Sequence, residues 1–264
     1  MGPTDTPEWA LELNSQLKML NKMTRLQLNA TRFGNLGPER ILTINHQGRA
    51  FDLHLPFGDN DYIQRKILND RGFYEANLLQ SLLEMNVVQH GGVIIDAGSN
   101  IGNHAVFFGG YFAPKRMYCF EPQDIAYATM VRNIELNLAG SDVRAHQSML
   151  GATSGRGGVA AYKHGNHGGA SFEASDTGGT QMVSLDEAIE PADVAAVSFI
   201  KIDVEGYQGE VIRGATQILS QSKPVLWIEV FANEKAETDE LLTKFGYRAQ
   251  KLSQNNYIYS VAAG

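Results

Sequence analysis

The stretch VIIDAGSNIGNHAVFF at residues 93–108 constrains the fold of this chain more than any other part of it. A short apolar run ends at Asp96, glycines follow at positions 98 and 102, and an apolar segment typical of a helix begins after them. A strand, a glycine turn and a helix in this order let the backbone approach a nucleotide closely. The motif therefore predicts an α/β fold with a nucleotide-type ligand bound at this turn.

The remainder of the chain after residue 92 supports this prediction. Apolar runs at 93–96, 117–121, 143–149, 197–203 and 225–230 alternate with helix-like segments at 101–112, 124–138, 207–220 and 234–245. Alternation of this kind predicts a parallel sheet covered by helices on both faces. Segments 247–252 and 257–261 lie too close in sequence for a crossover, so they predict an antiparallel hairpin at the sheet edge. Residues 151–180, rich in Gly, Ser and Ala, are predicted to form a long mobile loop.

The N-terminal third has a different character. It predicts a helix over 8–29, two strands over 41–55 around a turn at His46-Gln-Gly48, and helical structure over 74–85. We therefore divide the chain into an N-terminal extension, residues 1–85, and a ligand-binding domain, residues 86–264. The extension is expected to act as a cap with substrate or oligomer contacts.

The composition excludes several classes of protein. The 264 residues carry a net charge of −7, which argues against a partner held through nucleic-acid phosphates. A stripe of Lys18, Lys22, Arg25 and Arg32 is most simply a solvated helix face. No apolar run approaches the roughly 18 residues of a membrane span. The single cysteine, Cys119, excludes an internal disulfide. With no signal peptide visible, a cytoplasmic location is expected.

The charges around the glycine turn indicate which ligand it holds. A dinucleotide fingerprint requires G-x-G-x-x-G, whereas this turn has two glycines and a carboxylate, Asp96, at the end of the strand. That carboxylate would repel a pyrophosphate and attract the cationic head of S-adenosylmethionine. Glu121 ends the next strand, where a carboxylate can accept hydrogen bonds from both ribose hydroxyls. Together these residues favour S-adenosylmethionine.

Three segments carry a family resemblance. VIIDAGSNIGNHAVFF, CFEPQDIAYATMVRNIELN and SFIKIDVEGYQGEVIRGA resemble the FkbM-type S-adenosylmethionine-dependent methyltransferases, and the resemblance extends over roughly residues 73–264. Its most specific piece is Lys201-Ile-Asp-Val-Glu-Gly206. The resemblance implies the class I methyltransferase fold, a Rossmann-like seven-stranded sheet with one antiparallel strand. It also implies O-methylation of a hydroxyl on a sugar, a glycan or a related metabolite.

The motifs and the resemblance also imply a cofactor site. Asp96 and Asn100 would lie near the methionine part, Glu121 would bind the ribose, and Met149 would border the adenine unless it is a core methionine. Glu75 would fold over the amino end unless it is a surface glutamate. The complete set of expected cofactor-binding residues is Glu75, Asp96, Gly98, Asn100, Gly102, Glu121, Pro122, Ser148, Met149 and Asp203.

The catalytic residues are expected at the end of the fourth strand. Lys201, Asp203 and Glu205 alternate, so all three share a face if the strand stays extended. Asp203 is the first candidate for the base that removes the hydroxyl proton. Lys201 is a second catalytic candidate, although a buried ion pair between Lys201 and Glu205 is the alternative interpretation. His164 and His167 are rival bases, because histidine titrates near neutral pH.

A metal site is not expected. Glu229 and Asp203 could bind a divalent cation, but no further carboxylate completes a ligand set. His104 is expected to be structural.

Two other functions stay open: methylation of a nitrogen or a protein side chain, and a non-catalytic module that binds the cofactor. The first lacks the Asn/Asp-Pro-Pro-aromatic motif typical of nitrogen methylation. The expected partner is a small-molecule or glycan hydroxyl acceptor, and homo-oligomerisation is left open.

Overall fold

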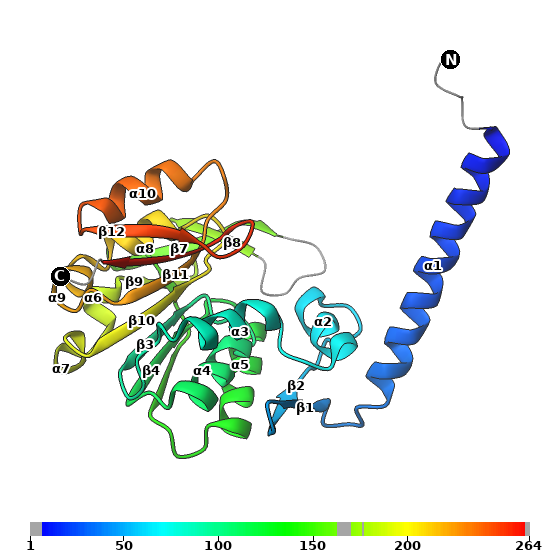
Figure 1. The fold of residues 1–264 in the computed structure, drawn as a ribbon, viewed down its shortest axis with the longest axis horizontal. Coiled ribbons are helices and arrows are strands. Elements are labelled where there is room, and N and C mark those ends of the chain that lie inside the picture. The colour runs from blue at the N-terminus through cyan, green and yellow to red at the C-terminus, as the bar shows by residue number, and fades with distance from the viewer. Residues whose placement is uncertain (1–6, 163–169, 176, 262–264) are drawn as a thin grey trace.

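A mixed seven-stranded sheet forms the centre of the protein in the computed structural model, which describes residues 7–162, 170–175 and 177–261 (Figure 1). The strand order is β12-β13-β11-β10-β3-β4-β5. The strands are β3 (Val93–Ala97), β4 (Arg116–Phe120), β5 (Val143–His146), β10 (Val197–Ile202), β11 (Val225–Glu229), β12 (Tyr247–Lys251) and β13 (Asn256–Val261). β13 pairs antiparallel with β11 and with β12, while the pairs from β11 to β5 are parallel. The predicted terminal hairpin is confirmed.

Side chains alternate between the two faces of this sheet and create two apolar layers. On one face Ile94 packs with α3 (Ala76–Met85), α4 (Asn103–Phe112) and α5 (Asp124–Asn137). On the other face Val93 and Ile95 pack with the shorter helices of the C-terminal half. Those helices are α6 (Leu185–Ala188), α7 (Pro191–Val194), α8 (Gln208–Arg213), α9 (Thr216–Gln221) and α10 (Lys235–Thr243). The strands are therefore covered on both sides, as continuous apolar runs in a parallel sheet require.

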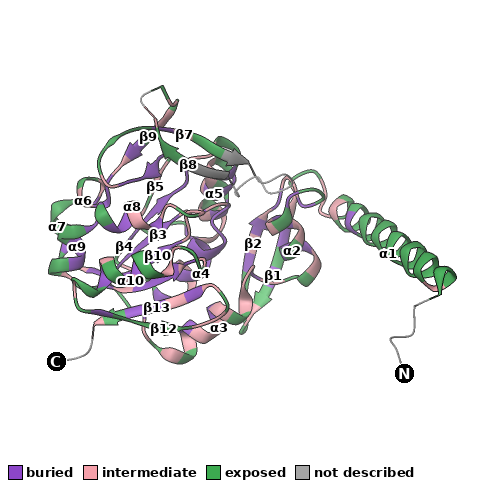
Figure 2. Ribbon diagram, turned by 90° about the horizontal axis from the view of Figure 1, so that it is seen from above, coloured by how far each residue is buried: buried purple, intermediate pink, exposed green. Residues whose placement is uncertain are grey.

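The N-terminal extension, residues 1–85, contains α1 (Glu8–Gly34), β1 (Ile41–His46), β2 (Arg49–His54) and α2 (Tyr62–Asp70), and it ends with α3, which packs on the sheet. The predicted pair of strands is confirmed. Buried Phe51 and Leu53 of β2 belong to the same apolar cluster as Phe107 of α4 and Trp227 of β11, so this part shares its core with the sheet. α1 projects from the body and is exposed along most of its length (Figures 1 and 2). Among the described residues, no helix combines the length and apolar character that crossing a membrane demands.

Two asparagines one turn apart on α5 attach the extension to the domain. Asn133 accepts a hydrogen bond from the His54 amide at 2.6 Å, and Asn137 accepts one from the Asp52 amide at 2.8 Å. Their amide nitrogens donate back to the carbonyls of the same two residues, at 3.3 and 2.7 Å. β2 is thus paired on its free edge by side chains instead of a third strand.

Asn137→Leu is expected to lower the free energy of unfolding by about 1–2 kcal/mol, because the Asp52 amide and carbonyl lose their partners. Urea denaturation of the full chain measures this change. Glu135→Leu, at an exposed position of the same helix, is the control and should change stability by about 0.5 kcal/mol or less. Equal effects of the two substitutions would mean that the bonds to β2 contribute nothing.

Three sequence predictions are wrong. Residues 151–180 are not a long loop: β6 (Met149–Leu150), β7 (Gly155–Tyr162), β8 (Ala170–Ala174) and β9 (Thr180–Val183) form a separate sheet of order β6-β9-β7-β8. Glycines permit this close packing, since a Cβ on Gly178 would lie 2.0 Å from the Gly157 carbonyl oxygen. The helix predicted over 207–220 is broken at Gly214, where a Cβ would lie 2.1 Å from the Gly151 carbonyl oxygen. The third strand ends at His146, before Ser148 and Met149.

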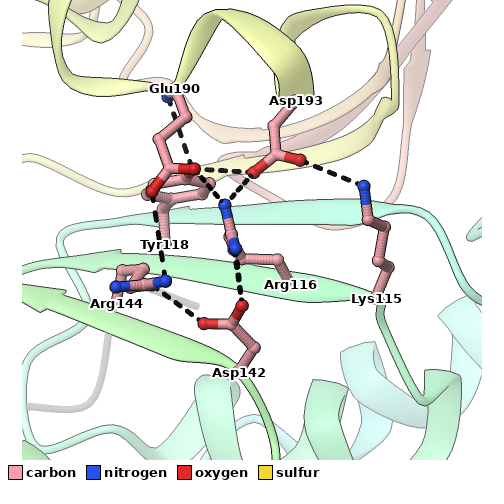
Figure 3. A network of polar contacts seen from close by, with 7 residues as sticks. All are labelled: Lys115, Arg116, Tyr118, Asp142, Arg144, Glu190 and Asp193. Carbon is pink, nitrogen blue, oxygen red and sulfur yellow. Dashed lines mark hydrogen bonds and ion pairs between the residues drawn. The ribbon is translucent and has the colours of Figure 1, made fainter.

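A polar network holds α7 against the amino ends of β4 and β5 (Figure 3). The Arg116 guanidinium lies between Asp142 and Asp193, each at 2.7 Å. The Tyr118 hydroxyl donates to buried Asp193 at 2.9 Å. Each buried polar group in the network therefore has a partner, and the network lies at the sheet edge opposite the candidate site described next.

Candidate active site

Four carboxylates meet at the carboxyl edge of the sheet. Glu229, Asp203, Asp96 and Glu121 lie at or just after the ends of β11, β10, β3 and β4, which are consecutive neighbours in the sheet. A cleft of 460 Å³ opens above them. Its opposite wall comes from the N-terminal extension. Ligands of open α/β sheets bind at this edge, so the cleft is the candidate site.

The turn after β3 is shaped by packing against other parts of the protein. Gly98, Asn100 and Gly102 have φ angles of 82°, 51° and 80°, in the left-handed region. A Cβ on Gly98 would lie 1.9 Å from the Asp203 carbonyl oxygen, and one on Gly102 would lie 3.1 Å from the side chain of Met130. The glycines are thus required to seat the turn on the end of β10 and on α5. Gly98 and Asn100 line the cleft, whereas Gly102 is not among its lining residues.

Glu121 is held in place by the same turn. Its carboxylate is 3% exposed and accepts hydrogen bonds from the amides of Asn100 and Gln123, both at 2.9 Å. Burial raises the pKa of Glu121 to about 7, although these two bonds act in the opposite direction. Each carboxylate oxygen keeps a free lone pair, so the group can still accept hydrogen bonds from a ligand.

A second, narrower pocket of 40 Å³ adjoins the cleft on the other side of Glu121. Its walls include the apolar side chains of Phe120, Pro122, Met149 and Val204. Ser148 also lines it, and the buried Ser148 hydroxyl has no hydrogen-bond partner within the described part of the chain. An apolar slot with one unsatisfied hydroxyl suits a flat heteroaromatic ring that carries a polar edge.

Asp96 lies beneath the turn and lines neither pocket. Its side chain is fully buried, and neither carboxylate oxygen has a hydrogen-bond partner among the described residues. Burial raises the pKa of Asp96, while the positive charge of nearby Lys201 opposes this rise. Its direct contact with a cofactor therefore stays a prediction.

The end of β10 differs from the extended strand expected from sequence. β10 ends at Ile202 and Glu205 has a φ of 50°, so the chain does not stay extended as far as Glu205. Lys201 is 2% exposed and its Nζ lies 3.1 Å from Asp203 Oδ2. The Lys201 ammonium pairs with Asp203, so the alternative interpretation of an ion pair with Glu205 is wrong.

Asp203 and Glu229 form a coupled pair of carboxyls in the cleft. Burial opposes the charge on Asp203, but Lys201 and a hydrogen bond from Glu229 hold the pKa of Asp203 below its usual range. Burial and the charge of Asp203 raise the pKa of Glu229 to about 8. At neutral pH the pair therefore holds one proton, which lies on Glu229. The protonated Glu229 donates a hydrogen bond to the Asp203 carboxylate.

Glu229 links protonation to stability. Its pKa is about 8 in the folded protein and about 4.5 in an unfolded chain, so the folded state binds more protons between these values. This contribution to stability is complete below about pH 4.5 and is lost as the pH rises through 8. Glu229→Gln should remove this loss and raise the melting temperature at pH 8 by a few degrees. Calorimetry at pH 6 and pH 8 tests this, with exposed Glu240→Gln as the control that should behave as wild type.

Several residues in the cleft were not identified from sequence. Tyr74 lines it, and burial raises the pKa of its phenol, which stays protonated and can donate. His104, expected to be structural, also lines the cleft, and its Nε2 lies 3.2 Å from Glu75 Oε2. Arg65 of α2 and Asn60 of the turn before α2 also line the cleft. The family resemblance begins near residue 73 and so reaches Tyr74, but no sequence signal indicated Asn60 or Arg65, because tertiary contacts alone bring them to the cleft.

Three of the nine non-glycine residues with positive φ angles in the described chain lie at the cleft. Glu75, Asn100 and Glu205 all have positive φ angles and all line it. Such conformations cost about 1–3 kcal/mol each in non-glycine residues and gather at functional sites.

His164 and His167 lie outside the described residues. Within the described chain, no group of three or more His, Cys, Asp or Glu side chains is arranged to hold a metal, and the absence of a metal stays a prediction.

Comparison with known proteins identifies the family. The methyltransferase FkbM domain matches residues 96–258, so the chain belongs to this family of S-adenosylmethionine-dependent methyltransferases. Hexuronic acid methyltransferase AglP of Haloferax volcanii is 27% identical over 170 residues, covering 60% of this chain and 63% of AglP. Methyltransferase sdnD of Sordaria araneosa is 30% identical over 94 residues, covering 36% of this chain and 32% of sdnD. The chain spans less than two thirds of the length of these relatives.

Solved structures are more distant in sequence. The methyltransferase FkbM from Methylobacillus flagellatus KT superposes with a TM-score of 0.49 at 14% identity, covering 92% of this chain and 60% of that one. The TYW2 protein of M. jannaschii, solved in complex with AdoMet, gives a TM-score of 0.41 at 11% identity, covering 84% of each chain.

The site residues fit S-adenosylmethionine. Glu121 keeps lone pairs for two ribose hydroxyls, and the apolar pocket beside it holds the unpartnered Ser148 hydroxyl. The carboxylates of Glu75 and Asp203 line the larger cleft, where they would stabilise the cationic methionine end. Because the narrow pocket is only 40 Å³, we expect flexible Met149 to move when a purine ring enters.

Proposed function

We propose that this protein is an S-adenosylmethionine-dependent O-methyltransferase acting on a hydroxyl of a sugar, a glycan or a related metabolite. The observation that carries the proposal is the coupled pair of Asp203 and Glu229, in a cleft that adjoins the Glu121 pocket. Under this proposal the pair would present a carboxylate, held ionised by Lys201 at 3.1 Å, to the acceptor hydroxyl beside the methyl group.

The cofactor is proposed to lie across the ends of β10, β3 and β4. Glu121 would accept both ribose hydroxyls, Pro122, Ser148 and Met149 would enclose the adenine, and Glu75 would face the amino end. Gly98, Asn100 and Gly102 shape the turn beneath the methionine part, with Asp96 below it. When bound, the cofactor supplies an electrophilic methyl group and leaves as a neutral thioether.

Asp203 is proposed to be the general base. As the acceptor oxygen bonds to the methyl carbon, the hydroxyl proton would pass to the Asp203 carboxylate, while the electron pair of the broken carbon–sulfur bond would stay on the sulfur. Glu229 donates a hydrogen bond that orients Asp203. Lys201 does not reach the cleft, so it acts as a positioning residue, not a catalytic one.

The character of the cleft supports a polyhydroxylated acceptor. Glu75, Asp203, Glu205 and Glu229 offer several carboxyl acceptors, and Tyr74 offers a donor, within one 460 Å³ space. Sugar hydroxyls both donate and accept hydrogen bonds, so such a lining can satisfy them. AglP is by name a methyltransferase for a hexuronic acid, which agrees with a sugar acceptor here.

The test is a screen of sugars and other hydroxyl acceptors in which release of S-adenosylhomocysteine is measured. Methylation of at least one hydroxyl compound is expected, with binding of S-adenosylmethionine and none of NAD in calorimetry. Binding of NAD alone would exclude the proposed cofactor, and methylation of amines or proteins only would favour the alternative acceptor class. Cofactor binding with no turnover on any acceptor class would favour a non-catalytic module.

The wider assignments remain proposals. Residues 1–85 are proposed to serve as a cap, since α2 and residues 74–75 supply one wall of the cleft. A cytoplasmic location and a homo-oligomer are predictions that await fractionation and light-scattering measurements.

A further inference from the structure

A groove rich in cations lies between α1 and α2, on the far side of α2 from the body of the domain (Figure 1). Its volume is 960 Å³. Among the described residues it is lined by six cations and a single carboxylate, Asp70, out of 22 Lys and Arg in a chain of net charge −7. The six are Lys18, Lys22, Arg25, Arg32, Arg65 and Lys66. The stripe interpreted from sequence as a solvated helix face is therefore one wall of a shared groove.

Most of these cations are not neutralised by the protein. Lys66 pairs with Asp70, and Arg32 donates to Asn69 Oδ1 at 2.6 Å, a bond that attaches α1 to α2. Lys18, Lys22, Arg25 and Arg65 have no carboxylate partner in the part of the chain that the structure describes. Gathering unpaired like charges costs free energy, and binding an anion across the groove would offset that cost.

The groove and the candidate active site meet at Arg65. This residue lines both spaces and belongs to α2, which is about 10 Å wide with its side chains. The two sides of α2 carry opposite charge. The cleft is lined by the carboxylates of Glu75 and Asp203, so an anionic group is repelled from it and attracted to the groove.

We propose that the groove binds the phosphate groups of the methyl acceptor, which is a sugar linked through a diphosphate. The inference rests on the proposed function. A neutral sugar hydroxyl enters the acidic cleft, and the diphosphate passes over Arg65 to the cations of α1. This charge separation orients the acceptor with its neutral end toward Asp203. Nucleotide-linked and lipid-linked sugars share this diphosphate, and either source satisfies the site.

The experiment compares the full chain with the double variant Lys22→Gln/Arg25→Gln. The matched control is Arg248→Gln/Lys251→Gln, which removes the same charge from exposed positions on β12. Calorimetry at low salt measures the affinity for inorganic diphosphate, for a nucleoside diphosphate and for a short prenyl diphosphate. The groove variant should bind inorganic diphosphate at least about tenfold more weakly than wild type, since hydrogen bonds to charged groups are lost. The control should stay within about twofold, and S-adenosylmethionine affinity should be the same in all three proteins.

The two organic diphosphates identify the source. A nucleoside diphosphate that binds more tightly than inorganic diphosphate supports a nucleotide-linked acceptor, and a tighter prenyl diphosphate supports a lipid-linked one. Equal diphosphate affinity in the groove and control variants would overturn the inference. So would binding of a single-stranded RNA oligonucleotide or anionic vesicles without binding of diphosphate.

The outcome separates this inference from the proposed function. Loss of diphosphate binding in the groove variant, with no methyl transfer to any hydroxyl by wild type, supports the groove as a diphosphate site and contradicts the proposed function. Methyl transfer to phosphate-bearing sugars with an unchanged KM in the groove variant supports the proposed function and overturns the inference. If both hold, the KM for such sugars rises about tenfold with an unchanged kcat.

Discussion

Asp203→Asn is expected to lower turnover by at least about a hundredfold while leaving the affinity for S-adenosylmethionine nearly unchanged. The substitution keeps the shape of the side chain and removes a carboxylate of the cleft that a neighbouring ammonium, Lys201, holds ionised at 3.1 Å. An amide cannot accept the hydroxyl proton, so the chemical step loses its base. Single-turnover rates and calorimetry on the same preparations measure the two quantities.

Glu229→Gln is the matched control for this prediction. Because the pKa of Glu229 is about 8, its side chain is protonated at neutral pH and donates to Asp203. The glutamine amide donates in the same direction, so turnover at pH 7 should fall by less than about tenfold. The opposite result, with Glu229→Gln inactive and Asp203→Asn active, would exchange the roles of the two carboxyls. An active Asp203→Asn together with an inactive His164→Ala or His167→Ala would transfer the base to residues 163–169.

Glu121→Ala should weaken binding of S-adenosylmethionine by about 1–3 kcal/mol, the usual cost of removing hydrogen bonds to a charged acceptor. The side chain is 3% exposed and is oriented by the amides of Asn100 and Gln123, so it is preorganised to accept the ribose hydroxyls. Equilibrium binding to the purified variant measures the loss.

Two further variants make this result specific. Glu121→Gln keeps the volume and one carbonyl acceptor, so its affinity should lie between those of wild type and Glu121→Ala. Glu84→Ala, at an exposed position on α3, should bind the cofactor as wild type does. Unchanged affinity in Glu121→Ala would mean that the ribose is held elsewhere, and the cofactor orientation proposed above would have to be abandoned.

The conformation of segments governed by interactions between neighbouring residues was predictable from the sequence. The run from Val93 to Ala97, the glycines of the turn and the apolar helix after it follow one another without interruption, so their conformation depends on near neighbours in the chain. The terminal hairpin was predictable for the same reason, since a short connection permits only antiparallel pairing. Glu121 lies at the end of β4, where strand order alone brings it to the ligand edge.

The residues that were missed depend on contacts between distant parts of the chain. The glycine-rich segment after Leu150 has no apolar period, and its strands form because Gly157 and Gly178 allow close packing. The alternative partner of Lys201 was misassigned, since the ammonium pairs with Asp203 and the chain does not stay extended as far as Glu205. The wall formed by Tyr74 and Arg65 follows from the position of α2 over the sheet.

The sequence by itself thus determined the α/β class, the turn after β3 and the carboxylates at the strand ends, because periodicity and turn chemistry act over a few residues. Only the tertiary structure decided which of those carboxylates is ionised, since that depends on the burial of Lys201 and Glu229 beside Asp203. It also decided that the cations of α1 face those of α2. Charge pairing and desolvation act through space, and residues 18 and 65 come together only when the chain has folded.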